Sequence, residues 1–193
     1  MTPKVLELGY TYLSSLGLPE LARPYMARLA DEINEGVSIA VLDGVHSVNV
    51  SRMESTGLVR ITVPVGTRQR AYSNSMGRVL LAALSPEELD RYFERAEIVP
   101  LTARTVTDPA RLRRMLASVK ANGYALVDQE LEPGLIALAV PLHDVTGKVV
   151  AAMNVTTHAY RADLRAVQDR YLPPLRAAAQ LIDEALRSAP WVH

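Results

Sequence analysis

Residues 66–84 read GTRQRAYSNSMGRVLLAAL, and the change of character within this stretch decides how the chain around it folds. The first half is polar and basic, whereas from Ser75 onward apolar residues recur at the spacing of a helix with one buried face. A loop therefore leads into a helix N-terminus, whose free N–H groups and positive dipole end can accept a carboxylate or phosphate. Gly77 would let a ligand approach that backbone, although a side-chain cap from residues 73–75 is the simpler explanation.

The chain before this stretch predicts helices followed by strands. Residues 4–16 and 20–34 each place apolar side chains at helical spacing. Residues 36–52 alternate around Asp43-Gly44, a strong two-residue turn signal, and predict a β-hairpin. Residues 58–64 alternate again and predict a third antiparallel strand directly before the loop.

The chain after this stretch is punctuated by clear helix caps and turns. Ser85-Pro86-Glu87-Glu88 is a capping box that starts a helix over 86–95, and Asp108-Pro109 starts another that Asn122-Gly123 ends. Three strands follow, over 124–130, 135–142 and 148–157, and then a helix from Ala162 with a break or kink at Pro173-Pro174. About six strands with helices before, between and after them predict an α+β sensor-like domain.

The composition limits the classes of function. The chain has 193 residues, of which 49% are hydrophobic, and suits one domain, alone or with an appended helix. Its 21 basic residues equal its 21 acidic residues, so it lacks the positive excess that binding to nucleic acid needs. It has no cysteine and only four scattered histidines, and we therefore expect no disulfide, metal or other cofactor. Nothing resembles a signal peptide or membrane span, which predicts a cytoplasmic protein with no membrane partner.

No catalytic motif stands out in the sequence. Nucleophile elbows, phosphate-binding loops, metalloprotease helices and dinucleotide fingerprints are all missing. The sharpest enzyme hypothesis pairs Asp128 and Glu130 as carboxylates, with His158 as a base. A solvated strand end explains these three residues more simply, so we predict that the protein is not an enzyme.

A small-molecule site explains the polar residues of the last strand better. Asn154 and Thr156 interrupt an apolar strand face, where neutral hydrogen-bonding groups suit a pocket for a polar ligand; the alternative is that they lie at the exposed strand end. If the helix start at Ser75 faces the same cavity, a small organic acid fits, with its carboxylate on the helix N–H groups. Candidate counter-charges for the acid are the loop arginines Arg68, Arg70 and Arg104.

Four separated segments carry a family resemblance. They are LELGYTYLSSL (6–16), SMGRVLLA (75–82), PLTARTVTD (100–108) and GYALVDQELEPGL (123–135). Together and in this order they resemble the C-terminal effector-binding domain of IclR-type bacterial transcription regulators. The resemblance is nearest to the branch that controls aromatic-acid catabolism through protocatechuate, 4-hydroxybenzoate or β-ketoadipate.

The resemblance implies an architecture and a set of partners. It implies a GAF-like antiparallel sheet with helices on both faces, in which residues 1–18 form a linker or dimerisation helix and 19–193 the effector-binding domain. Such regulators form homodimers that commonly pair into homotetramers. They bind promoter DNA through an N-terminal winged helix-turn-helix domain, which we expect to be absent from this chain. Binding of a small organic acid effector would then modulate promoter binding.

The resemblance also implies a binding site and leaves alternatives open. Ile136 stands where the family often has an arginine, so the ligand or its pose would differ here. An enzyme that uses Asp128 and His158, or a dimerisation module without a ligand, remain the rival functions. The predicted ligand-binding residues are Ser75, Met76, Gly77, Asp128, Leu135, Ala137, Asn154, Thr156, Ile61 and Gln69, with Tyr72 and Arg68 as neighbours.

Overall fold

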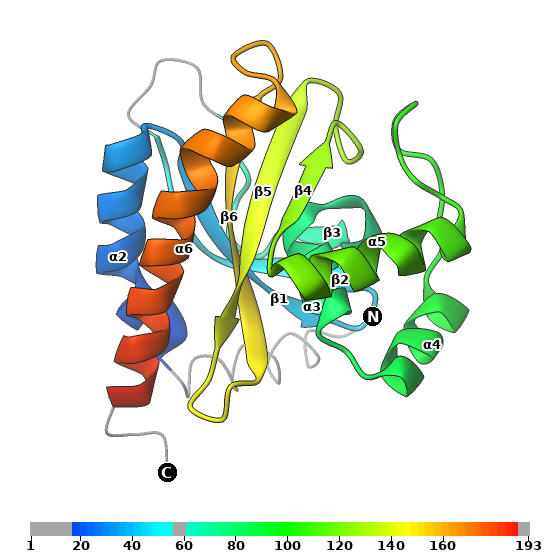
Figure 1. Cartoon of the computed structure of the whole chain (residues 1–193), viewed down its shortest axis with the longest axis horizontal. Coiled ribbons are helices and arrows are strands. Elements are labelled where there is room, and N and C mark those ends of the chain that lie inside the picture. The colour runs from blue at the N-terminus through cyan, green and yellow to red at the C-terminus, as the bar shows by residue number, and fades with distance from the viewer. Residues whose placement is uncertain (1–16, 56–60, 189–193) are drawn as a thin grey trace.

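A six-stranded sheet in the order β3-β2-β1-β6-β5-β4 forms the centre of the fold, and every pair of neighbouring strands is antiparallel (Figure 1). The computed structural model describes residues 17–55 and 61–188. In chain order the elements are α2 (Leu18–Ile33), β1 (Gly36–Asp43), β2 (His46–Met53), β3 (Arg68–Arg70), the 3-10 turn η1 (Ala71–Ser73), α3 (Ser75–Ala82), α4 (Pro86–Arg95), α5 (Pro109–Asn122), β4 (Ala125–Asp128), β5 (Leu135–His143), β6 (Val149–His158) and α6 (Leu164–Ser188).

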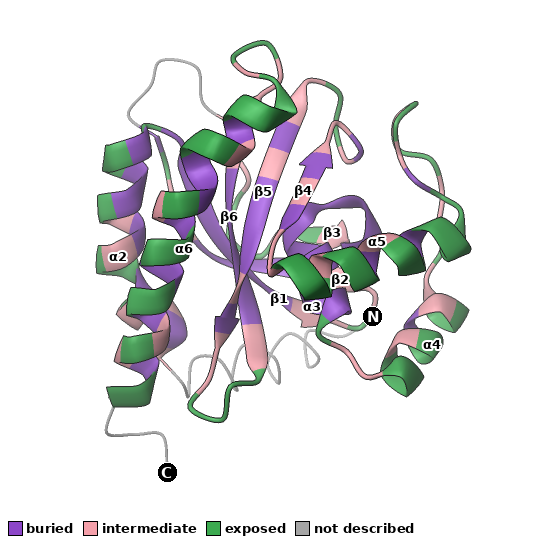
Figure 2. Cartoon of the chain, viewed as in Figure 1, coloured by how far each residue is buried: buried purple, intermediate pink, exposed green. Residues whose placement is uncertain are grey.

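Helices cover both faces of this sheet (Figure 1). On one face α2 and α6 pack against alternate apolar residues of the strands, among them Val37, Leu138 and Met153, and form the main core. On the other face α3 lies directly on the sheet, with α4 and α5 outside it (Figure 2). All eight residues of α3 are buried, because the helix has the sheet on one side and α5 on the other. The α+β class predicted from the sequence is confirmed.

The third strand of the sheet does not lie where the sequence predicted it. Residues 61–64 are not in a strand, and residues 58–60 lie outside the described part of the chain. A turn closes instead over residues 64–67, with Gly66 at φ 88° and the Thr67 N–H donating to the Pro64 carbonyl at 3.1 Å. This turn returns the chain to β2, so the edge strand is the predicted loop at Arg68–Arg70. Pro64 ends the earlier alternation because it has no N–H to donate.

The C-terminal helix is longer than the sequence predicted. Of the break or kink expected at Pro173-Pro174, the break is absent, because α6 runs continuously from Leu164 to Ser188. Two prolines inside a helix remove hydrogen bonds and clash with the preceding turn. Buried residues on both sides of them, such as Tyr171 and Leu175, share the face that packs on the sheet, and this packing keeps the chain helical through both prolines.

The N-terminal helix and the absence of a membrane span were also predicted from the sequence. The helix predicted over residues 4–16 lies outside the described residues. Within residues 17–55 and 61–188, no helix is both long and apolar enough to cross a bilayer.

Candidate functional site

A cavity of about 60 Å³ lies between the N-terminal half of α3 and the sheet. All six strands contribute residues to its lining, and the start of α3 lies over them. Seven of the residues predicted from the sequence line this cavity: Ile61, Gln69, Met76, Leu135, Ala137, Asn154 and Thr156. The sequence therefore led to a cluster that the fold does assemble.

Strand register explains why Asn154 and Thr156 meet the rest of the cavity. Asn154 is opposite Ser38 on β1, and Thr156 is opposite Ala137 on β5, so these residues share one sheet face. The Asn154 Nδ2 donates to Thr156 Oγ1 at 3.2 Å. The Asn154 Oδ1 is buried and has no hydrogen-bond partner among the described residues. A buried acceptor without a partner is costly, and a ligand hydroxyl would satisfy it.

Arg52 is the main lining residue that the sequence did not reveal. A β-bulge in the β1–β2 pair inserts Val50, so that Ser51 is opposite Ile39 and Asn49 is opposite Ala40. The simple alternation of the strand fails at this point. As a result Asn49 and Arg52, three residues apart, both face the cavity. Strand alternation alone would have placed Arg52 on the opposite face from Asn49.

The Arg52 side chain is buried to 6% exposure and brings a positive charge to the cavity wall. Its Nη1 donates to Ser38 Oγ at 2.9 Å, and its Nη2 donates to the carbonyl of Ile61. Its Nε donates at 2.7 Å to Glu54, whose side chain is 40% exposed at the rim. Ile136 has no part in this wall, because it faces the other side of the sheet and belongs to the main core.

The start of α3 is closed by a side-chain cap. Asn74 Oδ1 accepts from the Gly77 N–H at 2.8 Å, which uses the backbone donor that was expected to meet a ligand. A Cβ on Gly77 would lie 2.2 Å from the carbonyl oxygen of Ala71, so the glycine serves close packing and not ligand approach. Ser75 is buried without lining the cavity, and its Oγ has no hydrogen-bond partner among the described residues. Met76 is the residue of this helix start that reaches the cavity.

Tyr72 and Arg68 lie outside the cavity. The Tyr72 hydroxyl donates to the Val99 carbonyl at 2.7 Å and accepts from its N–H at 3.0 Å, in a separate core. Arg68 pairs with Asp43 at the surface. The other two candidate counter-charges are also paired with carboxylates, Arg70 with Glu97 and Arg104 with Asp128.

The structure also separates the residues of the enzyme hypothesis. Asp128 on β4 is opposite Ile136, and His158 on β6 is opposite Leu135, so the two side chains leave opposite faces of the sheet with β5 between them. Two strand spacings amount to about 10 Å. Asp128 does not line the cavity for the same reason. Among residues 17–55 and 61–188, no three His, Cys, Asp or Glu residues are grouped to hold a metal ion.

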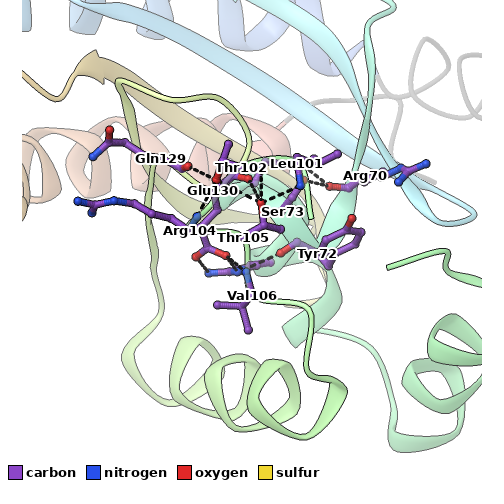
Figure 3. A network of polar contacts seen from close by, with 12 residues as sticks. Arg70, Tyr72, Ser73, Leu101, Thr102, Arg104, Thr105, Val106, Gln129 and Glu130 are labelled. Carbon is purple, nitrogen blue, oxygen red and sulfur yellow. Dashed lines mark hydrogen bonds and ion pairs between the residues drawn. The ribbon is translucent and has the colours of Figure 1, made fainter. Parts of the chain in front are cut away.

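Glu130 is not at a solvated strand end, because it forms a buried ion pair (Figure 3). Its two carboxylate oxygens accept from Arg78 Nη1 and Nη2 at 2.8 and 2.6 Å, and Oε2 also accepts from the Val106 N–H at 2.9 Å. Arg78 Nε donates to the Tyr72 carbonyl at 2.8 Å. The pair therefore fixes α3, the segment before α5 and the segment after β4 to one another. The sequence did contain a signal for this pair, because Arg78 is a lone charged residue among the apolar residues of α3.

Two titratable side chains near α3 have shifted pKa values. Burial raises the pKa of Tyr92 well above its usual range, although its hydroxyl accepts from the Tyr72 N–H at 3.1 Å. Burial, together with the charges of Arg68 and Arg70, lowers the pKa of His46. Both shifts favour the neutral form of the side chain.

Comparisons with known proteins agree with this fold. The family described as bacterial transcriptional regulator IclR C-terminal matches residues 10–184. The Pca regulon regulatory protein of Pseudomonas putida is 41% identical over 181 residues, which are 93% of this chain and 62% of that protein. The chain thus spans less than two thirds of that relative, which is a regulator and not an enzyme.

Two solved structures share the fold and contain aromatic acids. The PobR inducer-binding domain from Acinetobacter, a double mutant with 3-hydroxybenzoic acid, has a TM-score of 0.81 at 31% identity and covers 89% of this chain and 99% of that one. An IclR homologue from Microbacterium hydrocarbonoxydans with 4-hydroxybenzoate has a TM-score of 0.83 at 27% identity and covers 96% of this chain and 75% of that one.

Proposed function

The chain belongs to the bacterial transcriptional regulator IclR C-terminal family, and we propose that it is a ligand-sensing domain that binds a small organic acid in the cavity under α3. The observation that carries this proposal is the buried acceptor of Asn154 on one cavity wall and the buried guanidinium of Arg52 on another. An acceptor for a hydroxyl and a cation for a carboxylate, placed around an apolar floor, suit a hydroxylated acid. The hydroxybenzoate complexes of two structural relatives support an aromatic acid.

The proposed pose follows from the charges of the wall. The ligand carboxylate faces Arg52, which has its outer partner, Glu54, at the solvent rim. The ligand hydroxyl donates to Asn154 Oδ1, and the ring lies against Met76 and Ala137. This pose differs from one in which the N–H groups of α3 hold the carboxylate, since the Asn74 side chain already satisfies the Gly77 donor.

Binding requires the cavity to widen. Its volume of about 60 Å³ is well below the roughly 300 Å³ from which small-molecule sites start. Met76 is the wall residue best suited to move, because its unbranched thioether side chain repacks easily. A displacement of Met76 would press on α3, which joins the cavity to the Arg78–Glu130 pair. We propose that this helix conveys occupancy to the rest of the regulator.

The remaining parts of the regulator are included in this proposal. A DNA-binding domain would lie N-terminal to this domain in the whole protein, with residues 1–18 as the connecting and dimerising helix. Homodimers or homotetramers would then couple the acid to promoter binding, because the acid would bind one arrangement of subunits better than another.

The test is a thermal-shift panel followed by calorimetry. The acids are 3- and 4-hydroxybenzoate, protocatechuate, β-ketoadipate, pyruvate and glyoxylate. A ligand at 100 times its Kd should add about 2.7 kcal/mol to the free energy of unfolding. Asn154→Ala should weaken the binding of the selected acid about tenfold or more. Arg52→Met should weaken its binding roughly 10- to 150-fold, as expected for lost hydrogen bonds to charged groups.

Two matched variants serve as controls. Asn122→Ala changes the same residue type on an exposed helix end, and Arg68→Met changes an arginine outside the cavity. Both should bind the acid as the unchanged chain does. Binding that survives Asn154→Ala and Arg52→Met would overturn the site. A panel without a selective response would favour a dimerisation module, and turnover of an acid would favour an enzyme.

A further inference from the structure

A second and larger cavity, of about 520 Å³, lies at the other end of α3, where part of the sheet edge is open. β4 pairs with β5 only as far as Ala139, although β5 continues to His143 (Figure 1). Residues 140–143 therefore have no neighbouring strand on this side among the described residues. The ends of α3 and α5, the β5–β6 turn and the middle of α6 surround this open edge. None of these lining residues belongs to the cavity under Asn154.

The walls of this second cavity are largely apolar. Its volume lies within the roughly 300–1,000 Å³ of sites that enclose small organic molecules. The apolar wall residues are Val79, Ala82, Val119, Val140, Val149 and Ala179.

The rim of the cavity carries a surplus of positive charge. Lys120, Lys148 and Arg176 line it, and neither lysine forms a salt bridge with any described residue. The Arg176 Nη2 donates to the carbonyl of Asn122 at 2.7 Å, which fixes the guanidinium without neutralising it. Asp183 is the one carboxylate among the lining residues. This charge distribution favours an anion.

The same edge is poorly suited to pairing with a further strand. Pro141 has no N–H, and the His143 N–H already donates to Asp183 Oδ1 at 2.8 Å. The Asp183 Oδ2 lies 2.8 Å from the His143 Nδ1, so this carboxylate is occupied on both oxygens. Prolines and occupied donors are devices that protect sheet edges from pairing. An extended peptide would find few backbone donors, whereas a small molecule needs none.

We propose that this second cavity binds an organic carboxylate with an apolar body. The body lies on the apolar wall beside β5, and the carboxylate lies among Lys120, Lys148 and Arg176. Because α3 ends at this cavity and begins at the first one, both ligands would contact the same eight-residue helix.

The test uses 8-anilinonaphthalene-1-sulfonate, an apolar anion that fluoresces when bound, with octanoate and octylammonium as competitors. Octanoate should displace the dye, and octylammonium, which has the same tail and the opposite charge, should not. Lys148→Glu should weaken dye and octanoate binding at least tenfold, and Ala83→Trp, which fills the cavity from an exposed position, should abolish it. Arg165→Glu makes the same charge change at a 90% exposed site and should have no effect.

Several outcomes would overturn the proposal. Equal displacement by octylammonium, or an equal effect of Arg165→Glu, would show non-specific binding. Loss of octanoate binding in Asn154→Ala alone would place the ligand in the first cavity. A change in molar mass by light scattering in Ala83→Trp, without competition by octanoate, would show that a second copy of the chain fills the cavity. Circular dichroism of Lys148→Glu and Ala83→Trp verifies that both variants fold.

Discussion

Removing the buried ion pair between Arg78 and Glu130 should cost far more stability than removing an ion pair at the surface. Arg78→Met deletes two charged hydrogen bonds to Glu130, at 2.8 and 2.6 Å, and a third bond to the Tyr72 carbonyl. The two side chains are only 1% and 8% exposed, so water cannot replace these bonds. Breaking a buried pair by removing one partner costs about 3–5 kcal/mol. For a domain of this size that corresponds to a fall in Tm of roughly 6–20 °C.

A double-mutant cycle distinguishes the pair from a general loss of packing. Glu130→Gln alone should also destabilise the domain, because Arg78 would keep a buried charge without a counter-charge. The double variant Arg78→Met/Glu130→Gln should cost roughly 1–3 kcal/mol less than the sum of the single variants. Urea unfolding followed by circular dichroism gives the free energy of unfolding of all three variants, provided that its slope with urea concentration is the same in each.

The exposed pair of Arg113 and Asp90, with side chains 41% and 60% exposed, is the matched control. Arg113→Met should change stability by less than about 1 kcal/mol. A cost of Arg78→Met no greater than that of Arg113→Met, or additive effects of Arg78→Met and Glu130→Gln, would show that the buried pair is not a stabilising contact.

Two further substitutions test the packing of α3 and the sheet edge. Gly77→Ala should lower the free energy of unfolding in urea by about 1–3 kcal/mol, since the new Cβ would meet the Ala71 backbone at 2.2 Å. The control Ser118→Ala, on an exposed face of α5, should leave the stability unchanged. Equal effects of the two substitutions would contradict the role of this contact. Burial and the nearby arginines of β3 lower the pKa of His46 in the folded chain. The neutral side chain therefore contributes stability that is complete above the unfolded pKa of about 6.5. This stability is lost as the pH falls through the lower folded pKa. Between pH 7.5 and pH 5 the Tm of His46→Gln should therefore fall less than the Tm of the unchanged chain. Parallel curves of Tm against pH for the two proteins would exclude this role of His46.

Local signals in the sequence were sufficient to predict most elements. The capping box of Ser85 and Glu88 is formed as predicted, and α4 begins after it at Pro86. Gly123 ends α5 in the left-handed conformation, as the Asn-Gly signal predicted. Such signals act between residues a few positions apart, so they are complete within the sequence. The third strand was misplaced because a turn at residues 64–67 comes before the chain pairs with β2, whereas in α6 packing kept the chain helical through two prolines.

The candidate site was only partly predictable. Asn154 and Thr156 could be found because they interrupt an apolar strand that alternates regularly. Arg52 could not be found, since its direction depends on the bulge at Val50, and a bulge is defined only by the pairing of two strands. The role of Gly77 was misjudged because its neighbour, the Ala71 backbone, is set by how the 3-10 turn packs on α3.

The α+β class, the helix caps, the hairpin and the polar residues of the last strand all follow from the sequence, because short-range periodicity and turn chemistry specify these features. Which polar groups share a cavity is decided only by the tertiary structure, as are the contact of Arg78 with Glu130 across 52 residues of chain and the start of β4 opposite Ala139, which leaves a second cavity beside β5. These features depend on strand register and on contacts between distant segments. Register and long-range contacts arise from the packing of the whole domain, which no local pattern records.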